Sequence, residues 1–166
     1  MSFPEPNQHQ KDFFSPTYGR LTEDAMFSRL VQYMREGAGY KYNLIIGTDS
    51  FLASDTIFVS AVVIHRVGHG GRYFYRKIRH KKLGNMRQRI IYEATMSIEV
   101  ASYLRGQLSE NGYKGLPVEI HLDVGMNGDT RDIIKEVVGM VTGSGYAAVT
   151  KPDSYGATKV ADRHSR

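Results

Sequence analysis

The sequence predicts an α/β fold, in which a mixed five-stranded sheet has three antiparallel strands followed by parallel strands, with helices on both faces. Runs of β-branched and aromatic residues, typical of strands, dominate residues 43–78. Beyond residue 85, helical patterns alternate with short apolar runs, and strands linked by helical crossovers pair in parallel. The 166 residues suit a single domain over 21–166. We expect a flexible arm over 1–20 and an extra N-terminal helix over 22–36.

The first half of the chain predicts this helix and then a three-stranded meander. Thr22 and the acidic residues after it are typical of a helix start, and Gly37-Ala38-Gly39 predicts its end. Gly68-His69-Gly70-Gly71 separates two strand-like runs and predicts a hairpin between them. The three strands are expected over 43–49, 56–67 and 72–78.

The second half alternates helices with strands. Ile90, Ala94 and Ile98 recur at four-residue spacing within a long helix that is expected over 86–108. A strand that follows such a crossover should lie parallel to the first strand of the meander. The remaining elements are expected as a strand over 118–123, a helix from Asp129 to Gly143, a strand over 146–149, and a last helix from Pro152 to the C-terminus.

The composition excludes several classes of site. The chain has no cysteine, so a disulfide framework, a thiol nucleophile and a cysteine-ligated metal are excluded. No apolar run approaches the 18 residues of a membrane span, and residues 1–20 have no apolar signal segment. We therefore expect no membrane partner and a cytoplasmic location.

Basic residues are concentrated in one part of the chain. The net charge is +5, yet residues 65–89 hold nine Lys and Arg residues and no Asp or Glu. Such a stretch predicts a surface for a polyanion, with nucleic acid as the partner. The simpler interpretation is a solvated basic hairpin. The residues expected to contact nucleic acid are Arg72, Arg76, Lys77, Arg79, Lys81, Lys82, Arg87 and Arg89.

Two aspartates are expected at neighbouring strand ends. Asp49 ends the first predicted strand and Asp123 ends the fourth. Sites in α/β sheets form at the carboxyl ends of parallel strands where the strand order reverses. Neighbouring strands lie about 4.8 Å apart, so the two carboxylates would repel unless a cation lay between them. Mg²⁺ or Mn²⁺ takes such oxygen ligands. Each aspartate alone also fits an ordinary turn residue.

Two further acidic residues are placed where they could join this pair. Glu93 lies beside Ser97 at the rim of the apolar stripe of the long helix, from which a carboxylate can reach over the sheet edge. Asp162 follows the small residues Ala157 and Ala161, which would let the last helix approach the sheet closely. Alone, each is more simply a residue on a helix surface. The four acids in this chain order are much less expected by chance.

Five motifs carry a family resemblance that runs from about residue 14 to the end of the chain. They are Ile-Ile-Gly-Thr-Asp-Ser, Tyr-Glu-Ala-Thr-Met-Ser, His-Leu-Asp-Val-Gly, Lys-Pro-Asp-Ser-Tyr-Gly-Ala and Val-Ala-Asp-Arg-His. The chain resembles the YkuK-type family of bacterial ribonuclease-H-like proteins. This resemblance implies a ribonuclease-H-like sheet and an acidic site formed by Asp49, Glu93, Asp123 and Asp162.

The resemblance also implies a chemistry. Two Mg²⁺ or Mn²⁺ ions about 4 Å apart can activate water against a phosphodiester. Asp49 would bridge both ions, Glu93 and Asp123 would hold one, and Asp162 would hold the other. His164 would assist leaving or product release, although a histidine so near the terminus more often is simply exposed. The expected function is a metal-dependent nuclease acting on RNA, DNA or hybrid.

Two alternatives stay open. The chain could be a nucleic-acid-binding protein that retains the fold without catalysis. It could also be an adaptor whose basic surface meets an acidic protein. The sequence indicates neither the substrate preference nor the oligomeric state.

Overall fold

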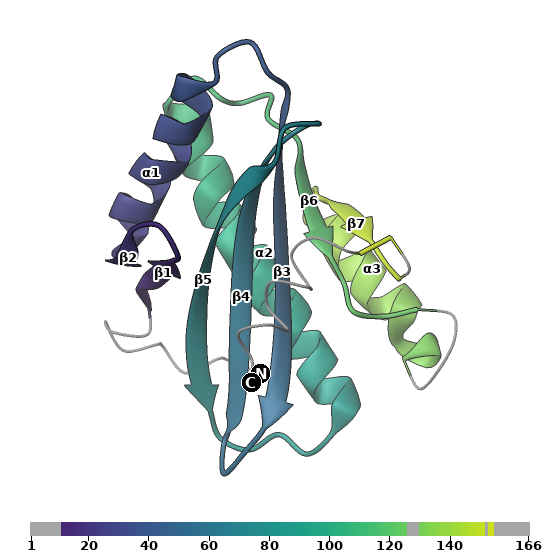
Figure 1. Ribbon diagram of the computed structural model, residues 1–166. Helices are drawn as coiled ribbons and strands as arrows, with labels where there is room; N and C mark the ends of the chain where they lie inside the picture. The colour runs from purple at the N-terminus through teal and green to yellow at the C-terminus, as the bar shows by residue number, and fades with distance from the viewer. Residues whose placement is uncertain (1–10, 126–129, 152, 155–166) are drawn as a thin grey trace.

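The computed structural model describes residues 11–125, 130–151, 153 and 154. Within these residues it contains seven strands, three α-helices and the short 3₁₀ helix η2 (Figure 1). In chain order these are β1 (Phe13–Ser15), β2 (Gly19–Leu21), α1 (Glu23–Glu36), β3 (Tyr42–Leu52), β4 (Thr56–Arg66), β5 (Gly71–His80), α2 (Met86–Glu110), β6 (Val118–His121), η2 (Arg131–Ile133), α3 (Ile134–Gly143) and β7 (Ala147–Val149).

All seven strands form one mixed sheet in the order β2-β1-β5-β4-β3-β6-β7. β3, β4 and β5 form the expected antiparallel meander, while β6 runs parallel to β3 and β7 runs parallel to β6. The chain thus builds the sheet outward from β3 to one side and then crosses over through α2 to the other side. The predicted α/β class and strand directions are confirmed, with two more strands than expected.

The two additional strands come from the segment before residue 21. β1 and β2 form a hairpin, and Phe14 of β1 pairs with Tyr75 of β5, where their rings stack at 5.8 Å. Residues 13–21 are therefore part of the sheet rather than of a flexible arm. Residues 1–10 lie outside the described part of the chain.

Helix α1 forms as its sequence predicts. The Thr22 hydroxyl accepts a hydrogen bond from the Ala25 backbone N–H at 3.1 Å, which satisfies one of the free donors at the helix start. Met26, Leu30 and Met34 recur every four residues and are buried against the sheet. The amphipathic face, together with the cap, explains why these residues form a helix.

Helix α2 lies across the sheet (Figure 1), and β3 is the strand that it contacts most. Asn85 caps it by accepting a hydrogen bond from the Gln88 backbone N–H at 3.0 Å. Ala94, Ala101 and Leu104 of its apolar stripe are fully buried. Small residues in this stripe let the helix approach β3 closely, which places its first turns beside the carboxyl end of that strand.

The helices that the structure describes all pack on one face of the sheet. α1, α2 and α3 share a single core cluster with alternate residues of the strands, such as Leu44, Ile46 and Ile120. The opposite face carries a smaller cluster formed by Ile45, Val59 and Ala61. The sequence predicted helices on both faces. The last predicted helix lies outside the described residues except for Asp153 and Ser154, which are not helical.

Candidate acidic site and nucleic-acid interface

The register of β3 and β6 sets Asp49 level with Asp123. The last pair of this parallel ladder joins Gly47 to His121, and each aspartate lies two residues further along its own strand. Asp49 was predicted to end its strand. In the structure β3 continues past it to Leu52 in its pairing with β4. β6 ends first. β3 and the segment after β6 therefore separate at the level of the aspartates, where the strand order reverses.

Asp49 and Glu93 approach this level from opposite faces of the sheet. Asp49 pairs with Val59, which belongs to the cluster on the face away from α2. The next residue, Ser50, is on the α2 face because side chains alternate along a strand. Its hydroxyl donates a hydrogen bond to Glu93 Oε2 at 2.8 Å. Ser50 thus orients the helix carboxyl beside the strand that carries Asp49.

The Glu93 carboxyl has a strongly raised pKa. Burial is the main cause and raises the pKa to about 8, while the hydrogen bond from Ser50 opposes it. The negative charges of Asp49 and Asp123 raise the pKa further, and the Arg89 charge lowers it. The charges of Asp49 on β3 and of Asp123, two residues after β6, therefore both act on the Glu93 carboxyl of α2.

A buried hydroxyl network fixes α2 against the sheet next to this site. Thr48 Oγ1 lies 2.8 Å from Ser60 Oγ on β4 and 2.8 Å from Ser97 Oγ on α2. All three side chains are buried. Ser97 is one helical turn after Glu93, so this network holds the turn that presents the carboxyl. The sequence interpretation used Ser97 only as a marker of the rim.

Lys151 provides a positive charge at Asp123. Its Nζ lies 2.7 Å from Asp123 Oδ1, and its backbone N–H donates to the Val124 carbonyl at 2.8 Å. Gly125 leaves room for this arrangement, since a Cβ there would come within 3.0 Å of the Lys151 Cβ. The sequence interpretation missed Lys151. It lies two residues after the end of β7, so the parallel pairing of β6 with β7 was the signal that could have placed it at this edge.

The carboxylate oxygens at this edge of the sheet are of the chemical type that binds a hard cation. Carboxylates are the preferred protein ligands of Mg²⁺ and Mn²⁺, and the Lys151 ammonium already places a cation against Asp123. In the part of the chain that the structure describes, however, no three histidine or acidic side chains lie together in a group that could hold a metal ion. Asp162 and His164, which were expected to complete the site, lie outside the described residues.

The comparisons with known proteins agree with this architecture. The family model described as "Ribonuclease H-like" matches residues 25–166. The chain belongs to the ribonuclease H-like family. It is also similar to the protein YkuK of Bacillus subtilis (strain 168), which is described as uncharacterized. The two are 31% identical over 93% of this chain and 96% of that protein. No solved structure matches the chain.

Membership in the ribonuclease H-like family suggests a nuclease-like or nucleic-acid-binding function. The family indicates the fold more strongly than an activity, because one fold can host several functions. None of the described helices combines the length and the apolar composition needed to cross a membrane.

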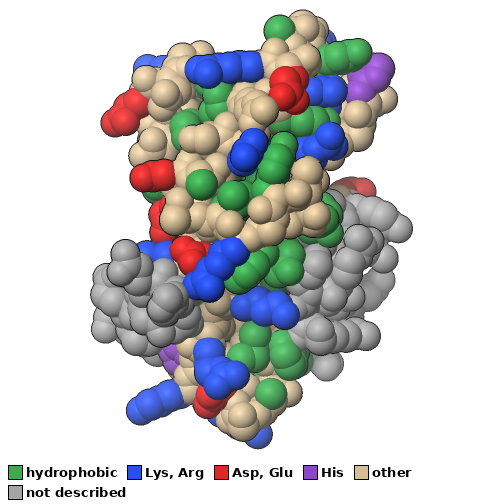
Figure 2. Space-filling view, turned by 60° about the vertical axis from the view of Figure 1, so that its left-hand side comes forward, with side chains coloured by type: hydrophobic (Ala, Val, Ile, Leu, Met, Phe, Trp, Pro, Cys, Tyr) green, Lys and Arg blue, Asp and Glu red, His purple; other side chains and the backbone are tan. Residues whose placement is uncertain are grey.

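The basic stretch of this ribonuclease H-like protein is only partly at the surface. Arg72, Lys77 and Arg79 on β5 are exposed, as are Lys81 and Lys82 in the loop before α2. Lys and Arg side chains recur from top to bottom of the face seen in Figure 2, with fewer acidic side chains between them. These five residues retain the exposure that phosphate contacts need.

Arg76 departs from the prediction that it contacts nucleic acid. Its residue is 8% exposed, its guanidinium lies 3.7 Å from Glu23 Oε1, and it lies over the Phe13 ring at 5.1 Å. Burial lowers the pKa of Arg76, while Glu23 raises it. Alternation along β5 explains the difference, because Arg76 is on the same face as the core residue Phe74.

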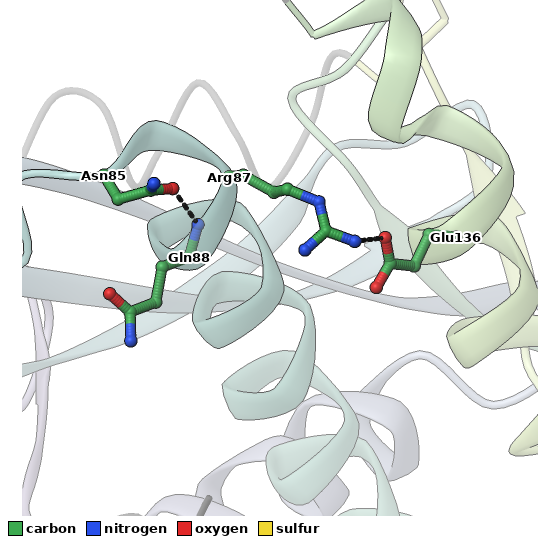
Figure 3. A network of polar contacts seen from close by, with 4 residues as sticks. All are labelled: Asn85, Arg87, Gln88 and Glu136. Atoms are coloured by element: carbon green, nitrogen blue, oxygen red, sulfur yellow. Dashed lines mark hydrogen bonds and ion pairs between the residues drawn. The ribbon is translucent and has the colours of Figure 1, made fainter.

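The two arginines at the start of α2 are engaged within the fold. Arg87 donates a hydrogen bond to Glu136 of α3, which links the two helices (Figure 3). Arg89 donates to the carbonyls of Leu83 and Gly84 and is the cation that acts on Glu93. Arg89 therefore stabilises the start of α2 beside the acidic site.

Proposed function

We propose that this protein is a metal-dependent phosphodiesterase that acts on RNA, DNA or a hybrid of the two. The observation that carries the proposal is that the charges of Asp49 and Asp123 both act on the Glu93 carboxyl, beside the reversal of strand order in a ribonuclease H-like fold. Isolated buried carboxyls are costly, and a site that gathers them is a candidate for function.

In this proposal the acids hold two Mg²⁺ or Mn²⁺ ions. Asp49, Glu93 and Asp123 would be ligands, and Asp162, from outside the described residues, would complete the set. When bound, the ions would activate a water and stabilise the leaving oxygen of a phosphodiester. His164 would assist product release.

The protein's own side chains position these groups. Ser50 orients Glu93, and the Thr48 hydroxyl network holds the helical turn that carries it. Lys151 neutralises Asp123 while no other cation is present. The exposed residues Lys77, Lys81 and Lys82 would bind phosphates of the nucleic acid beside this edge of the sheet.

The test is cleavage of labelled RNA, DNA and hybrid substrates by the purified full chain, with Mg²⁺, with Mn²⁺ and with a chelator. We expect cleavage that requires the metal and falls by at least about a hundredfold in Asp49→Asn and in Asp123→Asn. Asp132→Asn, on the exposed η2 segment, is the matched control and should retain activity. Cleavage that survives the double variant Asp49→Asn, Asp123→Asn would end the proposal.

A second candidate is a nucleic-acid-binding protein without catalysis. The ion pair of Lys151 with Asp123 favours it, since an ammonium that stayed in place would neutralise a proposed ligand permanently. This candidate predicts salt-dependent binding with no cleavage of any substrate under either metal. The same assay therefore separates the two functions.

A further inference from the structure

A pocket of about 690 Å³ lies at the end of the sheet away from the acids, where β3 and β6 begin. The end of α1 with the loop to β3, the start of the β4–β5 turn and the loop from α2 to β6 surround it. This volume is in the range of ligand pockets in proteins. Because β3 runs for 11 residues, the pocket is far from the level of Asp49.

The walls of the pocket are largely apolar and aromatic. Tyr40, Tyr42 and Tyr113 contribute rings, and Met34 and Leu116 contribute aliphatic surface. The Tyr40 ring lies 4.5 Å from the His69 ring between centroids, yet Tyr40 remains 47% exposed, so part of its ring is open to a ligand. A flat apolar group could stack on this ring, because aromatic faces bind other rings in offset or tilted arrangements.

The charge of the lining complements an anion. Arg35 and Lys41 line the pocket, both are exposed, and no Asp or Glu is among the lining residues. Within the described residues, no carboxylate forms an ion pair with either side chain. The Asn43 side chain, also in the lining, offers an amide donor and acceptor. The pocket thus combines ring faces, two cations and one amide.

One wall is held in place by the fold. The Tyr42 hydroxyl donates to the Gly37 carbonyl at 2.7 Å and accepts from Arg66 Nε at 2.9 Å. The Arg66 guanidinium lies 4.1 Å from the centre of the Tyr33 ring. Gly37 is the residue that this wall requires, since any Cβ there would overlap the Tyr42 hydroxyl and Arg66. A preformed wall reduces the entropy that a ligand must lose on binding.

We propose that this pocket binds a nucleotide, with the base against the exposed tyrosine ring and the phosphate at Arg35 and Lys41. Ring faces recognise bases, cations recognise phosphates, and an amide can pair with a base edge. The nucleotide could be free or could be the phosphorylated end of a strand, which presents the same chemistry. The site is separate from the acids and does not depend on cleavage.

The test is calorimetric titration of the full chain at low salt, without divalent ions, so that cleavage plays no part. The probes are AMP, GMP, CMP and UMP, with adenosine and inorganic phosphate as the two partial ligands. We expect at least one nucleotide to bind, and to bind about tenfold or more tightly than either partial ligand. A short single strand with a terminal phosphate forms a further arm, and tighter binding than the free nucleotide identifies a strand end as the source.

Variants locate the binding in the pocket. Tyr40→Ala and Lys41→Ala should each weaken nucleotide binding about tenfold, since one removes the ring and the other a phosphate contact. Lys114→Ala is the matched control, because Lys114 is an exposed lysine in the α2–β6 loop beside the pocket but does not line it. Thermal melting establishes that each variant folds. Nucleotide binding undetectable at millimolar concentration, or unchanged in both pocket variants, would overturn the proposal.

Discussion

At the scale of single residues, the Glu93 carboxyl has a strongly raised pKa. This carboxyl accepts a hydrogen bond from Ser50, and burial and the negative charges of Asp49 and Asp123 raise its pKa. With a pKa of about 8, it is mostly protonated at neutral pH in the absence of a cation. A metal ion would favour its ionised form, so metal binding should release a proton near pH 7.

The raised pKa predicts a pH-dependent stability. The neutral carboxyl of the unfolded chain ionises near 4.5, whereas the folded one ionises near 8. The contribution of Glu93 to stability is therefore fully present below pH 4.5 and is lost as the pH rises through 8. Above that pH, folding requires either uptake of a proton by this carboxyl or burial of its charge. Glu93→Gln keeps the acceptor for Ser50 and should exceed the wild type in unfolding free energy by roughly 2 kcal/mol or more at pH 9.

Urea unfolding at a series of pH values without divalent ions measures this difference. Glu110→Gln, at the exposed end of α2, provides the control and should show no such trend. An equal pH dependence in the wild type and in Glu93→Gln would contradict the assigned environment of this carboxyl.

Lys151 predicts an effect on metal affinity. Its ammonium and Asp123 are both substantially exposed, so their ion pair contributes at most about 1 kcal/mol. Lys151→Met keeps much of the apolar stem and removes the competing charge, and should raise the affinity for Mn²⁺ by up to about fivefold. Measurement of free Mn²⁺ by electron paramagnetic resonance checks this, with Lys114→Met as the control. Unchanged or weaker Mn²⁺ binding in Lys151→Met would argue against the competition.

At the scale of secondary-structure elements, the contact between α2 and β3 depends on buried hydroxyls as well as on apolar packing. Thr48→Val keeps the shape of the side chain but leaves Ser60 and Ser97 without their shared partner. We expect a loss of about 1–3 kcal/mol in the free energy of unfolding, measured by urea denaturation. Thr142→Val on the exposed surface of α3 should change it by less than about 0.5 kcal/mol. Equal losses in the two variants would show that the network adds no stability.

The sequence predicted those elements whose signals are local. Thr22 and the apolar repeat after it mark α1, and the glycines at 68–71 mark the β4–β5 hairpin. The β1–β2 hairpin was missed because each strand has only three residues and forms through pairing with β5, far along the chain. Length and periodicity cannot reveal such a strand, since its stability comes from a distant partner.

Part of the candidate site was predictable for the same reason. Asp49 and Asp123 follow recognisable strands, and Glu93 falls at the rim of a clear helical stripe. Lys151 was missed, and Arg76 was expected at the surface but is buried, because the position of each depends on tertiary structure. The first depends on which strand lies beside β6, and the second on which face of β5 packs against α1. Neither fact is present in the local sequence.

At the scale of the whole molecule, positive charge predicts the salt dependence of nucleic-acid binding. The exposed pair Lys81 and Lys82 is beside the start of α2, near the edge that carries Glu93. If both contact phosphates, replacing them with alanine should reduce the slope of log affinity against log salt by about 1.4 for a single strand. Fluorescence anisotropy with a labelled oligonucleotide measures the slope. The double variant Lys114→Ala, Lys135→Ala is the control. An equal reduction of the slope in this control would show that net charge, rather than the position of Lys81 and Lys82, determines the salt dependence.

The short outermost strands of the sheet affect the tendency of the protein to self-associate. Within the described residues, β2 and β7 are the outermost strands and have only three residues each, whereas the strands between β1 and β6 have ten or eleven. A short outer strand gives another molecule little backbone to pair with. Removing residues 13–21 would expose the part of the β5 edge around Tyr75, where Lys77 and Arg79 would be left as the main charges that oppose self-association. We therefore expect the N-terminal hairpin to limit edge-to-edge pairing of β5 with another molecule.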